Sequence, residues 1–88
     1  MSKVTETQQT ILRHLIYTEH YNYIREETGL AVGVIRDDLI TLSHLNMIEI
    51  FEDQDGTAGR KIRHFDNDHP ELFHYRATKW GLDAMSSR

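Results

Sequence analysis

The segment that decides the fold is ETGLAVGVIRDDLITLSHLNMIEI, residues 27–50 of an 88-residue chain. Gly29 can adopt the left-handed backbone conformation that ends a helix. Apolar residues then recur with a helical period over about 32–45, and Asn46, the next-best residue for a left-handed cap, follows them. The residues from Ile48 onward are typical of a strand. The segment therefore predicts two helices joined by a tight turn and followed by a strand.

The predicted helix over 32–45 has two unlike faces. One face is apolar and consists of Ile35, Leu39, Leu42 and Leu45. The other face consists of Gly33, Arg36, Asp37, Ile40, Thr41 and His44. Because an amphipathic helix buries its apolar stripe, we expect the first face to pack in the core and the second to be exposed.

The segments before and after this helix follow from similar signals. Thr5 and Gln8 have the spacing of a capping box, so a first helix should begin near Thr5. Its expected buried stripe is Ile11, Leu12, Leu15 and Ile16. Strands are predicted over 48–53 and 72–77 with a long connection, of which 61–65 would extend one side of the hairpin. Thr78 is a suitable N-cap for a short last helix over about 79–85, with Trp80, Leu82 and Met85 available for the core.

Length and composition restrict the class of protein. A chain of 88 residues is expected to form a single domain, 1–88. The chain has no Cys, no apolar run long enough to cross a bilayer and no apolar signal segment near its start, so we expect a cytoplasmic protein without membrane contact. No nucleophile elbow, phosphate loop or metal-hydrolase motif is present, and no enzymatic activity is expected.

The charges are unevenly distributed along the chain. The formal net charge is -4, which by itself disfavours strong non-specific binding to phosphates. A tight basic cluster, Arg60, Lys61 and Arg63, nevertheless lies within an acidic stretch. If folding brings this cluster beside Arg36, the acidic protein would still have a local positive face.

The order of predicted elements, with these residues, resembles the winged helix-turn-helix transcriptional regulators of the MarR-like and PadR-like groups. Two motifs carry the resemblance: IREETGLAVGVIRDDLITLSHLNMIE at 24–49, and YRATKWGLDAM at 75–85. The resemblance implies an α+β, mostly α fold with a three-helix bundle, a β-hairpin wing over about 48–77 and a short C-terminal helix. It places the helix-turn-helix at about 22–46 and the recognition helix at about 32–45.

The resemblance also implies a function, sequence-specific binding of double-stranded DNA in transcription regulation. The recognition helix would enter the major groove and the basic wing would contact the backbone. Arg36 is the best single reader of a base, because a guanidinium pairs bidentately with guanine. The DNA-binding residues expected on these grounds are Val32, Gly33, Arg36, Asp37, Ile40, Thr41, Arg60, Lys61, Arg63 and Lys79.

Departures from the family pattern, above all on the exposed face of the predicted recognition helix, leave an alternative open. Ala31 stands where a capping Ser or Thr is usual, and Asn46 where Gly is usual. On the exposed face, Asp37 would repel phosphates and Ile40 is apolar. A winged helix that binds a protein partner instead of DNA is therefore the second hypothesis. A homodimer is also open, through the first helix or through Tyr17, Tyr21 and Tyr23.

Histidine spacing raises a third hypothesis, a metal-responsive sensor. His64, His69 and His74 recur at intervals of five beside Asp66 and Asp68. This spacing matches neither a helical pair at i, i+4 nor a familiar loop pattern for zinc. The sequence therefore predicts neither a metal nor another cofactor.

Overall fold

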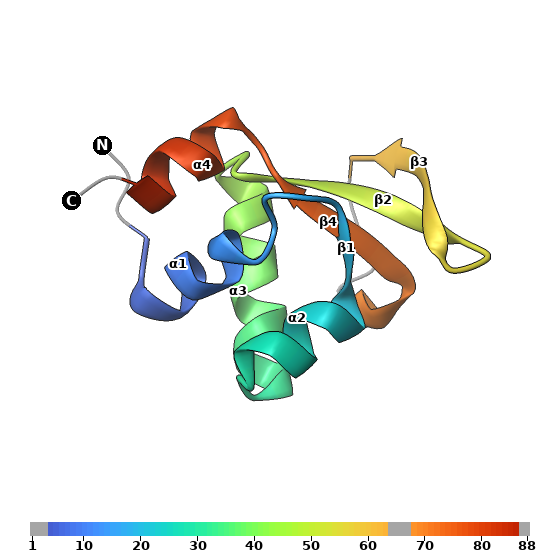
Figure 1. Cartoon of the computed structure of the whole chain (residues 1–88), viewed down its shortest axis with the longest axis horizontal. Coiled ribbons are helices and arrows are strands. Elements are labelled where there is room, and N and C mark those ends of the chain that lie inside the picture. The colour runs from blue at the N-terminus through green and yellow to red at the C-terminus, as the bar shows by residue number, and fades with distance from the viewer. Residues whose placement is uncertain (1–3, 64–67, 87–88) are drawn as a thin grey trace.

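The protein is a mixed α+β chain, and the computed structural model describes residues 4–63 and 68–86 (Figure 1). In chain order the elements are α1 (Glu6–Arg13), β1 (Glu19–His20), α2 (Tyr21–Thr28), α3 (Val32–His44), β2 (Ile48–Gln54), β3 (Thr57–Ile62), the 3₁₀ turn η1 (Pro70–Leu72), β4 (Phe73–Ala77) and α4 (Lys79–Ser86). The α+β class predicted from the sequence is confirmed. Residues 64–67 lie outside the described part of the chain, and so do the last two residues of the predicted extension over 61–65, whose first two residues belong to β3.

The predicted helix ends are present. Thr5 accepts a hydrogen bond from the Gln8 N–H, and the Gln8 side chain accepts one from the Thr5 N–H, which completes the capping box of α1. Gly29 has φ 67° and Asn46 has φ 59°, the left-handed conformation in which a helix ends. At the start of α3, Ala31 provides no side-chain cap.

The four strands form one antiparallel sheet in the order β1-β4-β2-β3. The sequence predicted one long connection between β2 and β4, but that connection contains a further strand, β3. Asp55 and Gly56 both have positive φ and form a two-residue turn that folds β3 back onto β2. The two-residue strand β1, which pairs with the outer edge of β4, was also not predicted.

The core lies between α1, α2 and α3 and one side of the sheet (Figure 1). Its fully buried residues include the predicted Ile11, Leu12 and Leu15 of the first helical stripe and Ile35, Leu39 and Leu42 of α3. Four predictions of core residues are wrong. Ile16 is 51% exposed because α1 ends at Arg13, so the helical period no longer applies. Leu45 lies just past the last helical residue of α3 and is 38% exposed. Trp80 and Leu82 of α4 are 65% and 37% exposed.

Trp80 is exposed because α4 packs through a different residue, Gly81. Gly81 is buried against the backbone carbonyl of Met47, and a methyl group at this position would collide with that carbonyl. Thr78 caps α4, since its Oγ1 accepts from the Gly81 N–H, and the same hydroxyl donates to the Asn46 carbonyl at 2.6 Å. The start of α4 is thus fixed to the turn between α3 and β2.

A buried carboxylate joins α1 to α3. Thr7 Oγ1 donates to Asp38 Oδ2 at 2.7 Å, and Gln8 Nε2 approaches Asp38 Oδ1 at 3.5 Å. Asp38 lies on the inner side of α3, whereas its neighbour Asp37 is exposed. Among the described helices, none is long and apolar enough to cross a membrane.

Candidate nucleic-acid interface

The first half of α3 is an exposed helical surface. Val32 is 54% exposed, and, apart from the neighbouring backbone of α3 itself, nothing lies within 4 Å of where a side chain of Gly33 would begin. Arg36 and Thr41 are also exposed. This agrees with the predicted polar face of the helix, which leaves backbone and side chains accessible to a partner.

The charge of Arg36 is partly balanced by its neighbour. Arg36 Nε lies 3.6 Å from Asp37 Oδ1, and the two side chains are 49% and 72% exposed. An ion pair this exposed contributes little to stability because water screens it. An incoming acceptor can therefore replace Asp37 at small cost.

Ile40 differs from the expectation of a free apolar side chain on this face. It is only partly accessible and packs against the core cluster. The reason is its place on the helical wheel, one residue beyond the buried Leu39 and two before the buried Leu42. The exposed surface of α3 is thus narrower than the sequence indicated.

The basic cluster of Arg60, Lys61 and Arg63 lies along β3 and just beyond its end, and not at the tip of the hairpin. The tip is the turn Asp55-Gly56, which carries a carboxylate. Arg60 is 80% exposed, with its Nε 3.7 Å from Glu52 Oε1, and Lys61 Nζ lies 2.9 Å from Glu49 Oε1. The two cations on the strand are therefore each next to a carboxylate of β2.

Glu49 is the centre of this charge network. Its Oε2 accepts from both Nε and Nη2 of Arg76, at 3.1 and 2.7 Å, while Oε1 faces Lys61. The hydrogen bond from Lys61 is the largest cause of a lowered pKa for Glu49, and Arg76 adds to it. The guanidinium of Arg76 also lies 5.5 Å from the ring centre of Phe51.

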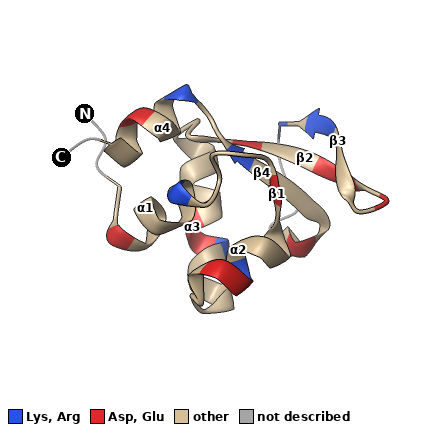
Figure 2. Ribbon diagram, viewed as in Figure 1, with Lys and Arg blue, Asp and Glu red and all other residues tan. Residues whose placement is uncertain are grey.

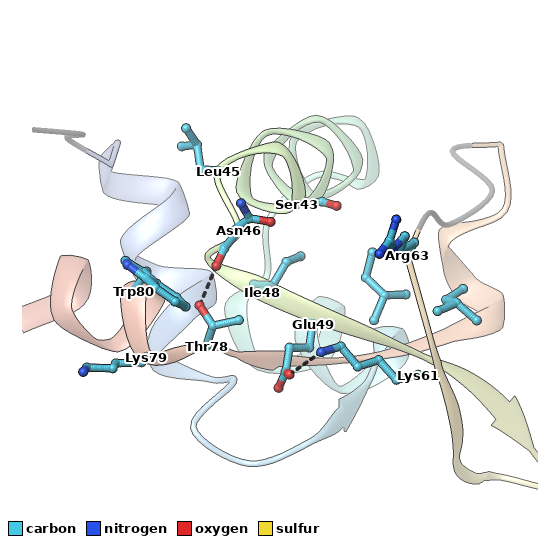
Figure 3. A pocket seen from close by; sticks show the side chains of 12 residues that line it. Ser43, Leu45, Asn46, Ile48, Glu49, Lys61, Arg63, Thr78, Lys79 and Trp80 are labelled. Carbon is cyan, nitrogen blue, oxygen red and sulfur yellow. Dashed lines mark hydrogen bonds and ion pairs between the residues drawn. The ribbon is translucent and has the colours of Figure 1, made fainter.

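A groove of about 880 Å³ brings three of the predicted site residues together (Figure 3). Lys61 and Arg63 lie at one end of it, and Lys79 lies at the other beside Trp80. Ile48, Ile50 and Ile62 form apolar parts of the lining, and Ser43, Leu45, Asn46 and Thr78 border it near the end of α3. Three cations thus surround a groove that contains one carboxylate, Glu49.

Two of these cations are available for a ligand. Neither Arg63 nor Lys79 forms an ion pair with any residue in the described ranges, 4–63 and 68–86, and both are exposed. Figure 2 shows basic residues on β3, on β4 and at the start of α4. These segments are far apart in the sequence, so Arg63 and Lys79 come to border the same groove only when the chain folds.

The predicted site residues therefore do not form one cluster. Six of them lie on α3, whose first residues are next to α2 (Figure 1): Val32, Gly33, Arg36, Asp37, Ile40 and Thr41. Lys61, Arg63 and Lys79 line the groove, which reaches the C-terminal end of α3, and Arg60 lies on β3 outside the groove lining. The sequence reading assigned no role to Ser43 or Trp80 in this site. The only hint in the local sequence that Trp80 is exposed is that Gly81, the residue through which α4 packs, follows it directly.

Comparisons of the chain with known protein families, with curated proteins and with solved structures found no match.

Proposed function

We propose that the chain is a winged-helix domain that binds duplex DNA as a sequence-specific transcriptional regulator. The element order supports this proposal, since α2 and α3 are joined by a short turn and followed by an antiparallel sheet. In this arrangement α3 is the recognition helix, and β2, β3 and β4 with their connections form an extended wing.

The observation that carries the proposal is the cationic groove at the end of α3. Lys61, Arg63 and Lys79 face one carboxylate there, although the whole chain has a formal net charge of -4. Local excess positive charge on an acidic protein concentrates phosphate contacts on one face. Between those contacts, the apolar part of the groove lining and the exposed Trp80 can pack against the sugar atoms of the DNA.

Each group of residues has its own task in this mechanism. Arg36 reads a guanine edge in the major groove, at the cost of its weak ion pair with Asp37. Arg63 and Lys79 contact phosphates, which fix the register of the domain on the duplex but carry no sequence information, while Lys61 stays paired with Glu49. Val32 and Thr41 are exposed on the same helix and can make further contacts with the bases or the backbone of the DNA.

The number of cations predicts the salt dependence of binding. The two phosphate contacts of Arg63 and Lys79 give a slope of about -1.8 for log K against log salt concentration. Replacing one contact should make the slope shallower by about 0.9. Fluorescence anisotropy with a mixed-sequence duplex, over a range of KCl concentrations, measures both quantities.

The variants Arg63→Gln and Lys79→Gln test the groove, with Arg13→Gln as the matched control. Arg13 is an exposed cation at the end of α1. The proposal expects weaker binding and a shallower slope in the two groove variants, with Arg13→Gln unchanged. Equal effects in all three variants, or no duplex binding by the wild-type chain at low salt, would rule out the proposed interface.

A protein-interaction module is the second candidate, because Ile16 and Tyr17 are adjacent, apolar and exposed. Their exposed fractions are 51% and 76%. A homodimer or a complex with another protein would bury this pair. Sedimentation of the wild-type chain and of an Ile16→Ser/Tyr17→Ser variant tests for the dimer. Loss of self-association with duplex binding retained would show that the pair serves association alone.

A further inference from the structure

Three potential metal ligands from three different strands meet on one side of the sheet. His20 lies on β1, Asp53 on β2 and His74 on β4. His20 and His74 are directly opposite in the β1–β4 ladder, and Phe51, two residues before Asp53, is opposite His74 in the β2–β4 ladder. One ligand atom from each of the three residues lies within 4.8 Å of the other two.

The three side chains already contact one another. His74 Nε2 lies 2.7 Å from Asp53 Oδ1, and the rings of His20 and His74 meet edge to face with centroids 4.9 Å apart. His74 is buried, whereas the Asp53 side chain is 34% exposed. The cluster is therefore held by the sheet on one side and open to solvent at Asp53.

We propose that His20, Asp53 and His74 bind one divalent transition-metal ion, with zinc as the best match. Two imidazole nitrogens and one carboxylate oxygen are ligands that zinc accepts, and three protein ligands leave a fourth tetrahedral position for water. Atoms about 2.1 Å from a tetrahedral zinc ion lie about 3.4 Å from one another. Small side-chain rotations bring atoms within 4.8 Å of one another to that separation.

Metal binding at this cluster moves the proton of His74 from one ring nitrogen to the other. A hydrogen bond from an imidazole nitrogen to a carboxylate requires the proton to be on His74 Nε2. The metal ion takes the place of that proton between His74 Nε2 and Asp53 Oδ1, and the neutral ring then carries its one proton on Nδ1.

The cluster is also coupled to the start of α2. His20 caps this helix, because its Nδ1 accepts a hydrogen bond from the Asn22 N–H at 3.0 Å. A metal ion on Nδ1 would displace that donor. A metal ion on Nε2 would leave the neutral ring with its proton on Nδ1, which then cannot accept. In either case metal binding removes the cap hydrogen bond and changes the environment of the Asn22 amide.

This site differs from the set of histidines that the sequence spacing indicated. His64 and Asp66 lie outside the described residues, and the cluster shares only His74 with that set. Its ligands are separated by 33 and 21 residues along the chain, so no local motif indicates it. The pairing of β1 with β4 and of β2 with β4 creates it.

Titration of the chain with ZnCl₂ by calorimetry, and with CoCl₂ by visible absorption, tests the proposal. We expect one ion per chain and a cobalt spectrum of four-coordinate geometry. His74→Gln and Asp53→Asn should weaken binding by more than about 100-fold, since even partners of metal ligands contribute on the order of 10–100-fold. Asp53→Asn keeps an oxygen that can accept from His74, so the variant separates loss of a ligand from loss of the fold.

A further variant and a control complete the design. His20→Asn removes a ligand but keeps a preferred capping residue for α2, and it should also abolish tight binding. His44→Gln replaces an exposed histidine of α3 outside the cluster and should leave binding unchanged. In the wild-type chain, zinc should shift the amide resonance of Asn22. Absence of metal binding, or equal weakening by His44→Gln, would overturn the proposal, and neither result depends on DNA binding.

Discussion

Lys61 Nζ lies 2.9 Å from Glu49 Oε1, so the one carboxylate of the cationic groove is in contact with one of its three cations. The same carboxylate accepts two hydrogen bonds from Arg76. Glu49 thus restrains two basic side chains at once. Its removal should have opposite effects on stability and on phosphate binding.

Glu49→Gln is expected to tighten duplex binding while it destabilises the fold. The neutral amide frees Lys61 for phosphate and removes a negative charge from the groove. The loss of two partly exposed ion pairs should cost about 1 kcal/mol. Anisotropy titration and urea unfolding measure the two effects, and weaker duplex binding by this variant would contradict the role given to the groove.

The stability of the protein should depend on pH through Glu49. Its pKa in the folded protein is lowered from the ordinary value of 4.5. A carboxyl group with a lowered folded pKa stabilises the protein above its unfolded pKa, and this stability is lost as the pH falls through the folded pKa. The stability difference between wild type and Glu49→Gln should therefore be present at pH 7 and disappear in acid. Urea unfolding at neutral pH and below the folded pKa measures it, and a difference independent of pH would show that packing, not charge, is responsible.

Gly81→Ala should destabilise the fold and Gly33→Ala should not. The added methyl group at Gly81 meets the Met47 carbonyl, and such overpacking costs about 1–3 kcal/mol. At Gly33 the space is open, and alanine should stabilise α3 by up to about 1 kcal/mol because it favours the helix. Thermal unfolding of the two variants gives the comparison. Similar unfolding temperatures would mean that α4 moves away from Met47 at little cost.

Asp38→Ala should be much more destabilising than Asp37→Ala, although the two residues are adjacent. Removal of the Asp38 carboxylate takes away the hydrogen bond from Thr7 that links α1 to α3. A lost hydrogen bond to a charged group costs about 1.5–3 kcal/mol. Asp37 is 72% exposed, and its replacement should change stability by less than about 0.5 kcal/mol. Chemical denaturation of both variants at neutral pH measures the difference.

The helix ends were predictable because their signals are local. The Thr5 and Gln8 pair and the left-handed Gly29 act within one turn of the chain, and each is present as the sequence indicated. The first four residues of β3 were missed because its sequence, TAGRKI, lacks an apolar alternation, although the Asp55-Gly56 turn was a usable signal. A short polar strand forms here because β2 already offers it a partner edge.

The candidate sites depend on contacts that the sequence cannot give. Spacing placed Arg36 on the exposed face of α3, and the structure agrees. Residue spacing could not show that Lys79 and Arg63 border one groove, or that Lys61 has a carboxylate partner. The exposure of Trp80 follows from the contact of Gly81 with Met47, which is also non-local.

The place of β3 in the strand order has a consequence for association between copies. As the last strand of the described sheet, β3 has a pairing partner on one side only, and an edge of this kind invites a strand from another molecule. Its exposed Arg60 and Lys61 would meet the same positive charges on a second copy, which disfavours edge-to-edge aggregation. The two cations of β3 thus also oppose association between copies of the chain, and variants that neutralise them are expected to aggregate more readily.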